Sequence, residues 1–174
     1  IKIMKKIQMV DLKGQYEHIK EQVNQSVLET IESTMFINGP SVKSFQDHLE
    51  KYLGVKHVIP CANGTDALQI ALMGLGLKPS DEVITADFTF AATVEVISLL
   101  GLTPVLVDVD PKTFNIDIPS IEKAIGPKTK AIIPVHLFGQ AADMEEILAL
   151  AKKWPWPQML ALAKKIGRGP KCWP

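Results

Sequence analysis

Cysteine is scarce in this sequence of 174 residues, and long apolar runs are missing from it. Cys61 and Cys172 are the only thiols, too few for a disulfide scaffold and without the paired spacing of a structural zinc site. Such sparse cysteine suits a reducing compartment, so we expect a cytoplasmic protein. No run approaches the roughly 20 apolar residues of a membrane-spanning helix, and the N-terminus lacks the apolar block of a secretion signal. We therefore expect no association with membranes.

Acidic residues are missing from residues 147–174, although the formal net charge of the whole chain is zero. All 19 Asp and Glu lie at or before Glu146, where 13 basic residues accompany them and leave a net charge of −6. The remaining segment carries six Lys or Arg and all three tryptophans. An acidic body argues against nucleic acid as the main partner. Because the composition changes abruptly after Lys153, we expect 154–174 to be a divergent tail, such as a frameshift or an early termination would produce.

Apolar periodicity predicts two helices near the N-terminus, at 16–33 and 41–53, separated by an Asn-Gly-Pro turn. The first helix places its apolar residues on one face. The second is expected to turn one apolar face inward, formed by Val42, Phe45, Leu49 and Leu53. We interpret 1–54 as a helical N-terminal segment.

From residue 55 onward, apolar segments alternate with helical patterns. The strands are predicted at 57–62, 82–86, 103–109 and 130–138. The helices are predicted at 65–75, 89–100, 119–125 and 143–153. Nearly continuous apolar strands are typical of a mainly parallel sheet that is buried on both faces. Right-handed crossovers then place helices on both sides, so the expected fold class for 55–153 is a layered α/β/α unit.

The segment "CANGTDALQIALMGLG" joins an apolar run to a helix through Asn63, Gly64 and Thr65. In an open α/β sheet, ligands bind outside the carboxyl ends of the strands, and a helix N-terminus there attracts a phosphate. Two interpretations stay open at this point. The turn is an ordinary capped one, with Asn63 or Thr65 as the cap, or it is an anion site. It contains neither of the glycine patterns of dinucleotide-binding and Walker-type sites.

Three further groups stand at or near the ends of predicted strands. Phe88 and Phe90 stand where a strand meets a helix, either to pack in the core or to stack on a flat heteroaromatic ring. The carboxylates of Asp87, Asp108, Asp110 and Asp117 lack a metal-type spacing and are expected to serve as caps and turn formers. His136 stands alone, and a structural role is favoured over a catalytic one. We expect no metal site.

Several segments in order resemble one family: "MVDLKGQY", the stretch from "FINGP" to "VDVDP", and "KTKAIIPVHLFGQAADMEEILALAKK". They are similar to the DegT/StrS-type sugar-nucleotide aminotransferases, which are fold type I enzymes dependent on pyridoxal 5′-phosphate. The resemblance covers about residues 8–153. It implies that 1–153 is the N-terminal part of the large domain of such a transferase.

The resemblance also implies roles for particular residues. Gly64 and Thr65 match the pair that holds the cofactor phosphate, and Phe90 matches the aromatic residue stacked on the pyridine ring. Asn38 and Gly39 lie in a segment that resembles one near the substrate. Family members are typically homodimers, so a homodimer or self-association is expected. The usual reaction moves an amino group from glutamate to a nucleotide-linked keto-sugar.

Two family elements have no match in this sequence. The carboxylate beside the pyridine nitrogen and the Schiff-base lysine would both follow "LALAKK", where the tail resembles neither. We therefore assign no catalytic residue and expect the chain to be inactive alone. Two alternatives stay open: a non-catalytic α/β module that binds an anion or dimerises, and a fragment of a pyridoxal phosphate-dependent sugar dehydratase.

Overall fold

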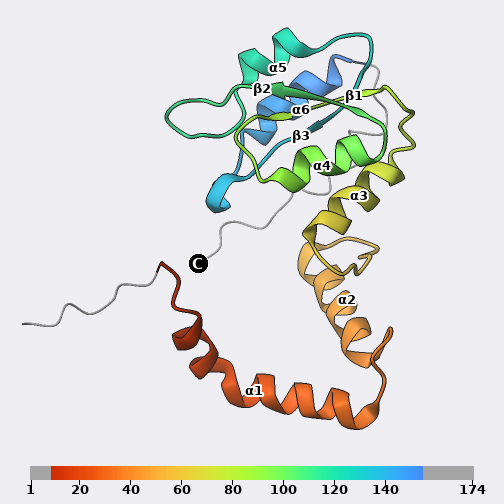
Figure 1. The fold of residues 1–174 in the computed structure, drawn as a ribbon, viewed down its shortest axis with the longest axis vertical. Helices are drawn as coiled ribbons and strands as arrows, with labels where there is room; N and C mark the ends of the chain where they lie inside the picture. The colour runs from red at the N-terminus through yellow and green to blue at the C-terminus, as the bar shows by residue number, and fades with distance from the viewer. Residues whose placement is uncertain (1–8, 155–174) are drawn as a thin grey trace, which may run out of the picture. The chain divides into compact units, whose positions relative to one another are not determined.

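A computed structural model describes residues 9–154 of the chain. These residues belong to two compact units, which divide the chain into Ile1–Val58 and Ile59–Pro174. Figure 1 traces the elements of both units in chain order. Among residues 9–154, no helix combines the length and the apolar character that crossing a bilayer requires.

The first unit contains two helices, α1 (Leu12–Ser33) and α2 (Pro40–Leu53). The carboxylate of Asp11 begins α1 by accepting the N–H of Gly14 at 2.9 Å. In α2, Pro40 occupies the first turn, where its missing N–H costs nothing. Gly54 ends α2 with a φ of 63°, a backbone conformation that glycine adopts without strain. Both predicted helices are confirmed; α1 starts four residues earlier than predicted, and α2 starts one residue earlier.

Neither helix of the first unit contains a buried residue. The expectation that the apolar face of α2 points inward is therefore wrong: Phe45 is 57% exposed, and Val42 and Leu53 are exposed as well. The apolar face of α1, formed by Ile19, Val23, Val27 and Ile31, is also exposed. Two short amphipathic helices have too little apolar surface to enclose a core between them.

The second unit is built on a three-stranded sheet of β1 (Glu82–Ala86), β2 (Thr103–Val107) and β3 (Thr129–Ile133). Both strand pairs are parallel, and the spatial order is β2-β1-β3. The helices are α3 (Gly64–Gly74), α4 (Ala91–Leu99), α5 (Ile118–Ala124) and α6 (Met144–Lys152), with the short 3-10 helix η1 (Leu137–Gly139). The predicted α/β class with a parallel sheet is confirmed.

The strand order explains why helices cover both faces of this sheet. The chain passes from β1 to β2 in one direction and then returns across β1 to β3. Because both crossovers are right-handed in parallel sheets, α4 and α5 lie on opposite faces (Figure 1). Helix α3 packs on α4, and α6 packs on α5. The core between these layers centres on fully buried side chains, among them Val83, Ile84, Val96, Ile97 and Ile121.

Three strand predictions need correction. Residues 57–62 form no strand, and Ile59 is 71% exposed. A strand exists only by pairing, and residues 57–62 pair with none of β1, β2 and β3. The strand predicted at 103–109 ends at Val107, and the one predicted at 130–138 covers Thr129–Ile133. Pro134 follows β3 directly, and its missing N–H cannot extend a strand ladder.

Candidate functional site

The turn before α3 is a capped helix N-terminus. The side-chain oxygen of Asn63 accepts the N–H of Asp66 at 2.9 Å, and its carbonyl accepts the N–H of Ala67 at 3.1 Å. The amide nitrogen of Asn63 also donates to the carboxylate of Asp66 at 3.2 Å. This is a capping arrangement of the kind that begins many helices, so the prediction of a cap at this turn is confirmed for Asn63.

The cap leaves two amides unused at the start of α3. Within residues 9–154, neither the N–H groups of Gly64 and Thr65 nor the Thr65 hydroxyl has a hydrogen-bond acceptor. These three donors lie at the end of the helix where the dipole is positive, and that donor set suits a phosphate. The carboxylate of Asp66 in the same first turn opposes this preference, because it already places a negative charge there.

Gly64 is not required by the fold itself. Its backbone is not left-handed, and a Cβ added to it would meet no atom within 4 Å. The protein therefore leaves open space beside the free amides. A glycine in such a place lets an anion approach the backbone closely.

Phe88 and Phe90 have different surroundings. The ring of Phe88 lies against that of Phe114, with centroids 5.8 Å apart and planes tilted by 47°. Phe90 precedes α4 and is 79% exposed. Packing of both rings in the core is thus excluded, since Phe88 is 49% exposed as well, and Phe90 is the more exposed of the two.

The loops that follow β1 and β3 lie at the same end of the sheet, the one formed by the carboxyl ends of the strands. Because β1 and β3 are parallel neighbours, Phe90 and His136 both follow carboxyl ends, where ligands bind in such sheets. His136 also lines a groove together with Gly64, between α3, β3 and α6. The groove has a volume of about 370 Å³, and apart from its one histidine its walls are apolar.

Hydrogen bonds hold the loop that carries His136. The Nδ1 atom of His136 accepts the N–H of Ala142 at 3.1 Å. Asn115, only 7% exposed, accepts the N–H of Leu137 at 3.4 Å and donates to the carbonyl of Ala141 at 3.0 Å. Phe138 in this loop has a φ of 50° and is 96% exposed. A bulky residue in the left-handed region is unusual, and such residues cluster at functional sites.

Sequence reasoning missed Asn115 and Phe138. Asn115 belongs to "TFNID", a segment whose composition indicates only a turn. Its contacts bridge positions that are more than 20 residues apart, and no local pattern predicts such contacts. The strain at Phe138 carries no signal in the sequence either.

Two of the four carboxylates expected to be caps or turn formers, Asp110 and Asp117, act in this way. Asp117 caps α5 by accepting the N–H of Ser120 at 2.9 Å. Asp110 accepts the N–H groups of Thr113 and Lys112, and these bonds lower the pKa of its carboxyl. No group of three or more possible metal ligands exists in the part of the chain that the structure describes.

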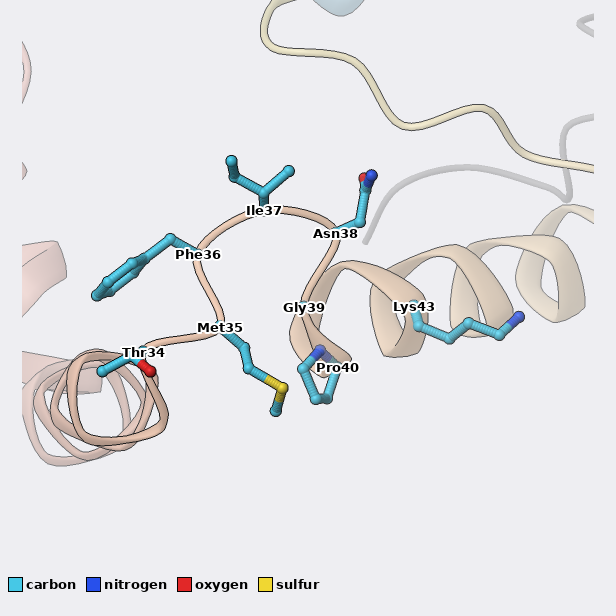
Figure 2. A pocket seen from close by; sticks show the side chains of 8 residues that line it. All are labelled: Thr34, Met35, Phe36, Ile37, Asn38, Gly39, Pro40 and Lys43. Carbon is cyan, nitrogen blue, oxygen red and sulfur yellow. The ribbon is translucent and has the colours of Figure 1, made fainter.

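Asn38 and Gly39 belong to the first unit, in the bend between α1 and α2 (Figure 2). Asn38 has a left-handed φ of 51°, and Gly39 is buried so tightly that a Cβ would collide with the carbonyl oxygen of Met35. The side chains of Ile37 and Asn38 project from the outer side of the bend, and the residues of the bend together with Lys43 line a hollow of about 570 Å³. The bend thus presents an amide side chain on a strained backbone.

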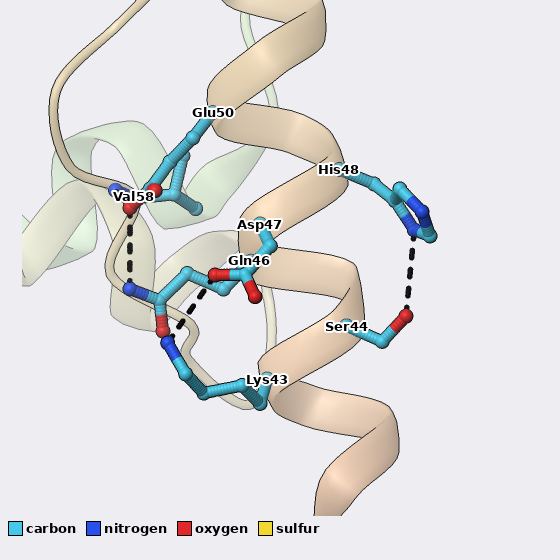
Figure 3. A network of polar contacts seen from close by, with 7 residues as sticks. All are labelled: Lys43, Ser44, Gln46, Asp47, His48, Glu50 and Val58. Carbon is cyan, nitrogen blue, oxygen red and sulfur yellow. Dashed lines mark hydrogen bonds and ion pairs between the residues drawn. The ribbon is translucent and has the colours of Figure 1, made fainter.

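A polar network along α2 stabilises the segment after this helix (Figure 3). The carboxylate of Glu50 accepts the N–H of Val58 at 3.0 Å and the side-chain amide of Gln46 at 3.2 Å. The bond from Val58 has the larger effect and that from Gln46 the smaller, and together they lower the pKa of Glu50 below its ordinary value of 4.5. Lys43 extends along α2 to Asp47 at 3.2 Å, an exposed pair of small energetic value.

Known proteins are similar to this chain in sequence and in arrangement. A model described as the DegT/DnrJ/EryC1/StrS aminotransferase family matches residues 17–160. The chain is 47% identical over 161 residues to UDP-2-acetamido-2-deoxy-3-oxo-D-glucuronate aminotransferase of Pseudomonas aeruginosa, covering 92% of this chain and 45% of that protein.

Solved structures agree with this match. A DegT DnrJ EryC1 StrS aminotransferase from Brucella abortus superposes with a TM-score of 0.81 and 44% identity, over 85% of this chain and 42% of that one. The NtdA protein of Bacillus subtilis, solved with bound cofactor PMP, gives a TM-score of 0.74 and 41% identity, over 76% and 31% of the two chains. The chain thus spans less than half the length of these relatives.

Proposed function

The chain belongs to the DegT/DnrJ/EryC1/StrS aminotransferase family, and on that premise we propose that it is the N-terminal part of a pyridoxal phosphate-dependent sugar aminotransferase. The whole enzyme would move an amino group from glutamate to a nucleotide-linked keto-sugar. The relative from Pseudomonas supports this substrate class, because its name describes an aminotransferase for a UDP-linked oxo-sugar acid.

The free donors at the start of α3 are the observation that carries the proposal. The N–H groups of Gly64 and Thr65 and the Thr65 hydroxyl would hold the cofactor phosphate. A Cβ added at Gly64 would meet nothing within 4 Å, so the backbone there is open to an approaching phosphate. The phosphate would fit this place by its hydrogen bonds and its size. The negative charge of Asp66 would weaken phosphate binding, but it does not occupy any of the three donors.

Phe90 would orient the ring of the cofactor. Its exposed ring follows the carboxyl end of β1, and an aromatic face there can stack on a flat pyridine ring. The cofactor, when bound, supplies an electron sink for the substrate carbon. The contribution of these residues is binding and orientation.

The proton-transfer groups of the reaction are not assigned to this chain. No Asp or Glu occurs after Glu146 to accompany the pyridine nitrogen, and no lysine of the tail stands in the family's context. In this proposal the described residues bind and orient the cofactor.

The bend between α1 and α2 would contact the sugar substrate. Asn38 offers a donor and an acceptor on a backbone held by the buried Gly39. A strained, polar bend of this kind is typical of ligand-binding segments. The exposed apolar face of α1 supports a further proposal, that copies of the chain associate through this helix.

Calorimetric titration with 4′-deoxypyridoxine 5′-phosphate tests the cofactor site. This analogue lacks the aldehyde, so it cannot react with surface lysines. We expect Thr65→Ala to weaken binding about ten-fold, or about 1.4 kcal/mol, because it removes one hydrogen bond to a charged group. Thermal stability should not change, since the hydroxyl bonds no acceptor in the described protein. Unchanged affinity in Thr65→Ala, or no binding by the unmodified chain, would contradict the proposal.

A further inference from the structure

We propose that the apolar groove between α3, β3 and α6 is an intramolecular docking surface, and that its occupant is residues 157–166 of the same chain in the form of a short helix. The proposal is independent of the proposed function, because it involves no cofactor. It rests on the position of the groove, on a repeated segment of the sequence and on the distribution of charge.

The groove lies at an edge of the sheet. β3 pairs with β1 on one side, and no strand within residues 9–154 lies on its other side. Helix α3 borders the groove from one face of the sheet and α6 from the other. Among its lining side chains, Ala67 is exposed, and Leu68 and Leu148 are only half-buried. Apolar surface at a sheet edge is a liability for aggregation, and proteins commonly cover it with a helix or a loop.

The sequence contains a second copy of the segment that forms most of α6. The residues "LALAKK" occur at 148–153 and again at 160–165, twelve positions later. In α6 the buried side chains are those of Ile147, Leu150 and Ala151. The matching positions of the second copy are also apolar: Met159, Leu162 and Ala163. The second copy therefore repeats an apolar stripe of a kind that already packs on this unit.

The composition of the second copy favours a helix. Leu, Ala and Lys are strong helix formers, and the same residues are helical in α6. Pro157 suits a first turn, and Gly167 suits the position just after a last turn. A helix over 157–166 would be about 15 Å long. Residues 153–156, between it and the end of α6, are enough for the loop of a helical hairpin.

The cap of α6 explains why the second copy would take the groove and not the place of α6. The carboxylate of Asp143 accepts the N–H of Glu146 at 3.0 Å and so begins α6. The matching residue of the second copy is Pro155, whose side chain has no oxygen to cap a helix. The first copy therefore forms the better-capped helix, and the adjacent groove is left for the second.

Charge orients the proposed helix. Both α3, which leads into β1, and α6, which follows β3, begin at the carboxyl end of the sheet. Their first turns place acidic residues there: Asp66, Glu145 and Glu146. A helix antiparallel to α6 brings Lys164 and Lys165 of its last turn to this end. The same complementarity holds for the whole chain, since the residues up to Glu146 carry a net charge of −6 and 147–174 carry +6.

Disulfide trapping in the full-length chain tests the proposal. Cys61→Ser and Cys172→Ser remove the native thiols. Ala71→Cys then places a thiol in the α3 wall of the groove, and Leu162→Cys places one on the apolar stripe. The matched control combines Ala71→Cys with Ala161→Cys, because position 161 lies on the opposite side of the proposed helix. Mild oxidation followed by non-reducing electrophoresis and mass spectrometry gives the rate and the partners of each disulfide.

We expect the pair that includes Leu162→Cys to form a disulfide within one chain at least about ten-fold faster than the control pair, because docking raises the effective concentration of the two thiols. Adding Ala163→Asp, which places a charge on the stripe, should remove this advantage. Adding Ala161→Asp should preserve it. Equal rates for the two pairs would overturn the proposal. A disulfide between two chains would also overturn it, because the occupant would then be a second copy.

Dye binding gives a second measurement that needs no cysteine variant. In the otherwise unmodified chain, Ala163→Asp should uncover the groove and raise the fluorescence of anilinonaphthalene sulfonate several-fold. Ala161→Asp introduces the same charge two positions away and should leave the fluorescence unchanged. Equal fluorescence of the two variants would contradict the docking of residues 157–166, whatever the chain does with a cofactor.

Discussion

Replacing Gly64 with alanine tests whether this glycine serves ligand binding rather than the stability of α3. A Cβ at this position would meet no atom within 4 Å, and the backbone there is not left-handed. The substitution therefore introduces no strain. A Gly→Ala change at a compatible site stabilises by about 0.4–1 kcal/mol, chiefly by restricting the unfolded chain. For a chain of this size that corresponds to a rise of about 1 to 4 °C in Tm.

The same methyl group would stand beside the amides that are proposed to hold the phosphate. We expect Gly64→Ala to weaken 4′-deoxypyridoxine 5′-phosphate at least about ten-fold, or about 1.4 kcal/mol. Thermal unfolding followed by circular dichroism gives the stability, and calorimetry gives the affinity. The expected result is a protein that is slightly more stable and binds more weakly.

Gly74→Ala is the matched control. Gly74 is the last residue of the same helix, and a Cβ there also meets nothing within 4 Å. It should raise Tm to a similar extent and leave the affinity unchanged. Full affinity in Gly64→Ala would refute the idea that a ligand occupies this space. A marked fall in its Tm would refute the reasoning about the fold.

Three other changes test the first unit. Gly39→Ala should destabilise the bend by about 1–3 kcal/mol, because the new Cβ has no room; faster amide exchange in the bend measures this, and unchanged exchange would contradict it. Hydrogen bonds from Val58 and Gln46 lower the pKa of Glu50, so the bond between its carboxylate and the Val58 N–H should persist above pH 4.5 and be lost as the pH falls through the lowered pKa. The NMR shift of the Val58 amide should follow this titration, and Glu50→Gln should abolish that pH dependence. Val27→Lys should reduce self-association in light scattering, whereas Gln25→Lys on the opposite face of α1 should not; equal behaviour of the two variants would argue against the α1 interface.

The alternation of apolar runs with helical patterns was enough to predict the α/β class and the position of the helices. Asp117 at α5 and Asn63 at α3 were recognisable as caps, because capping depends on residues three positions apart. The predicted strand at 57–62 failed because an apolar run specifies neither a partner strand nor burial, and Ile59 within it is exposed. The ends of β2 and β3 were misjudged for a similar reason, since apolar residues continue beyond the last ladder bond.

The candidate site could be predicted only in part. The Gly-Thr pair at α3 and Phe90 are local features, and their neighbours in the sequence connected them to a family. Their roles as cofactor-binding residues stay predictions until a ligand is measured. The separation of Phe88 from Phe90 required the structure, because Phe114, which contacts Phe88, lies more than 20 residues away.

By itself, the sequence determined the properties that depend on short spacings: the helices, their caps, the turn residues and the family motifs. The tertiary structure alone decided which side chains remain available. Within residues 9–154 it supplied no acceptor to the donors of Gly64 and Thr65, and it exposed Phe90 and brought Asn115 to the loop of His136. The physical reason is that burial and hydrogen-bond satisfaction depend on contacts between segments far apart in the chain, which a one-dimensional pattern does not contain.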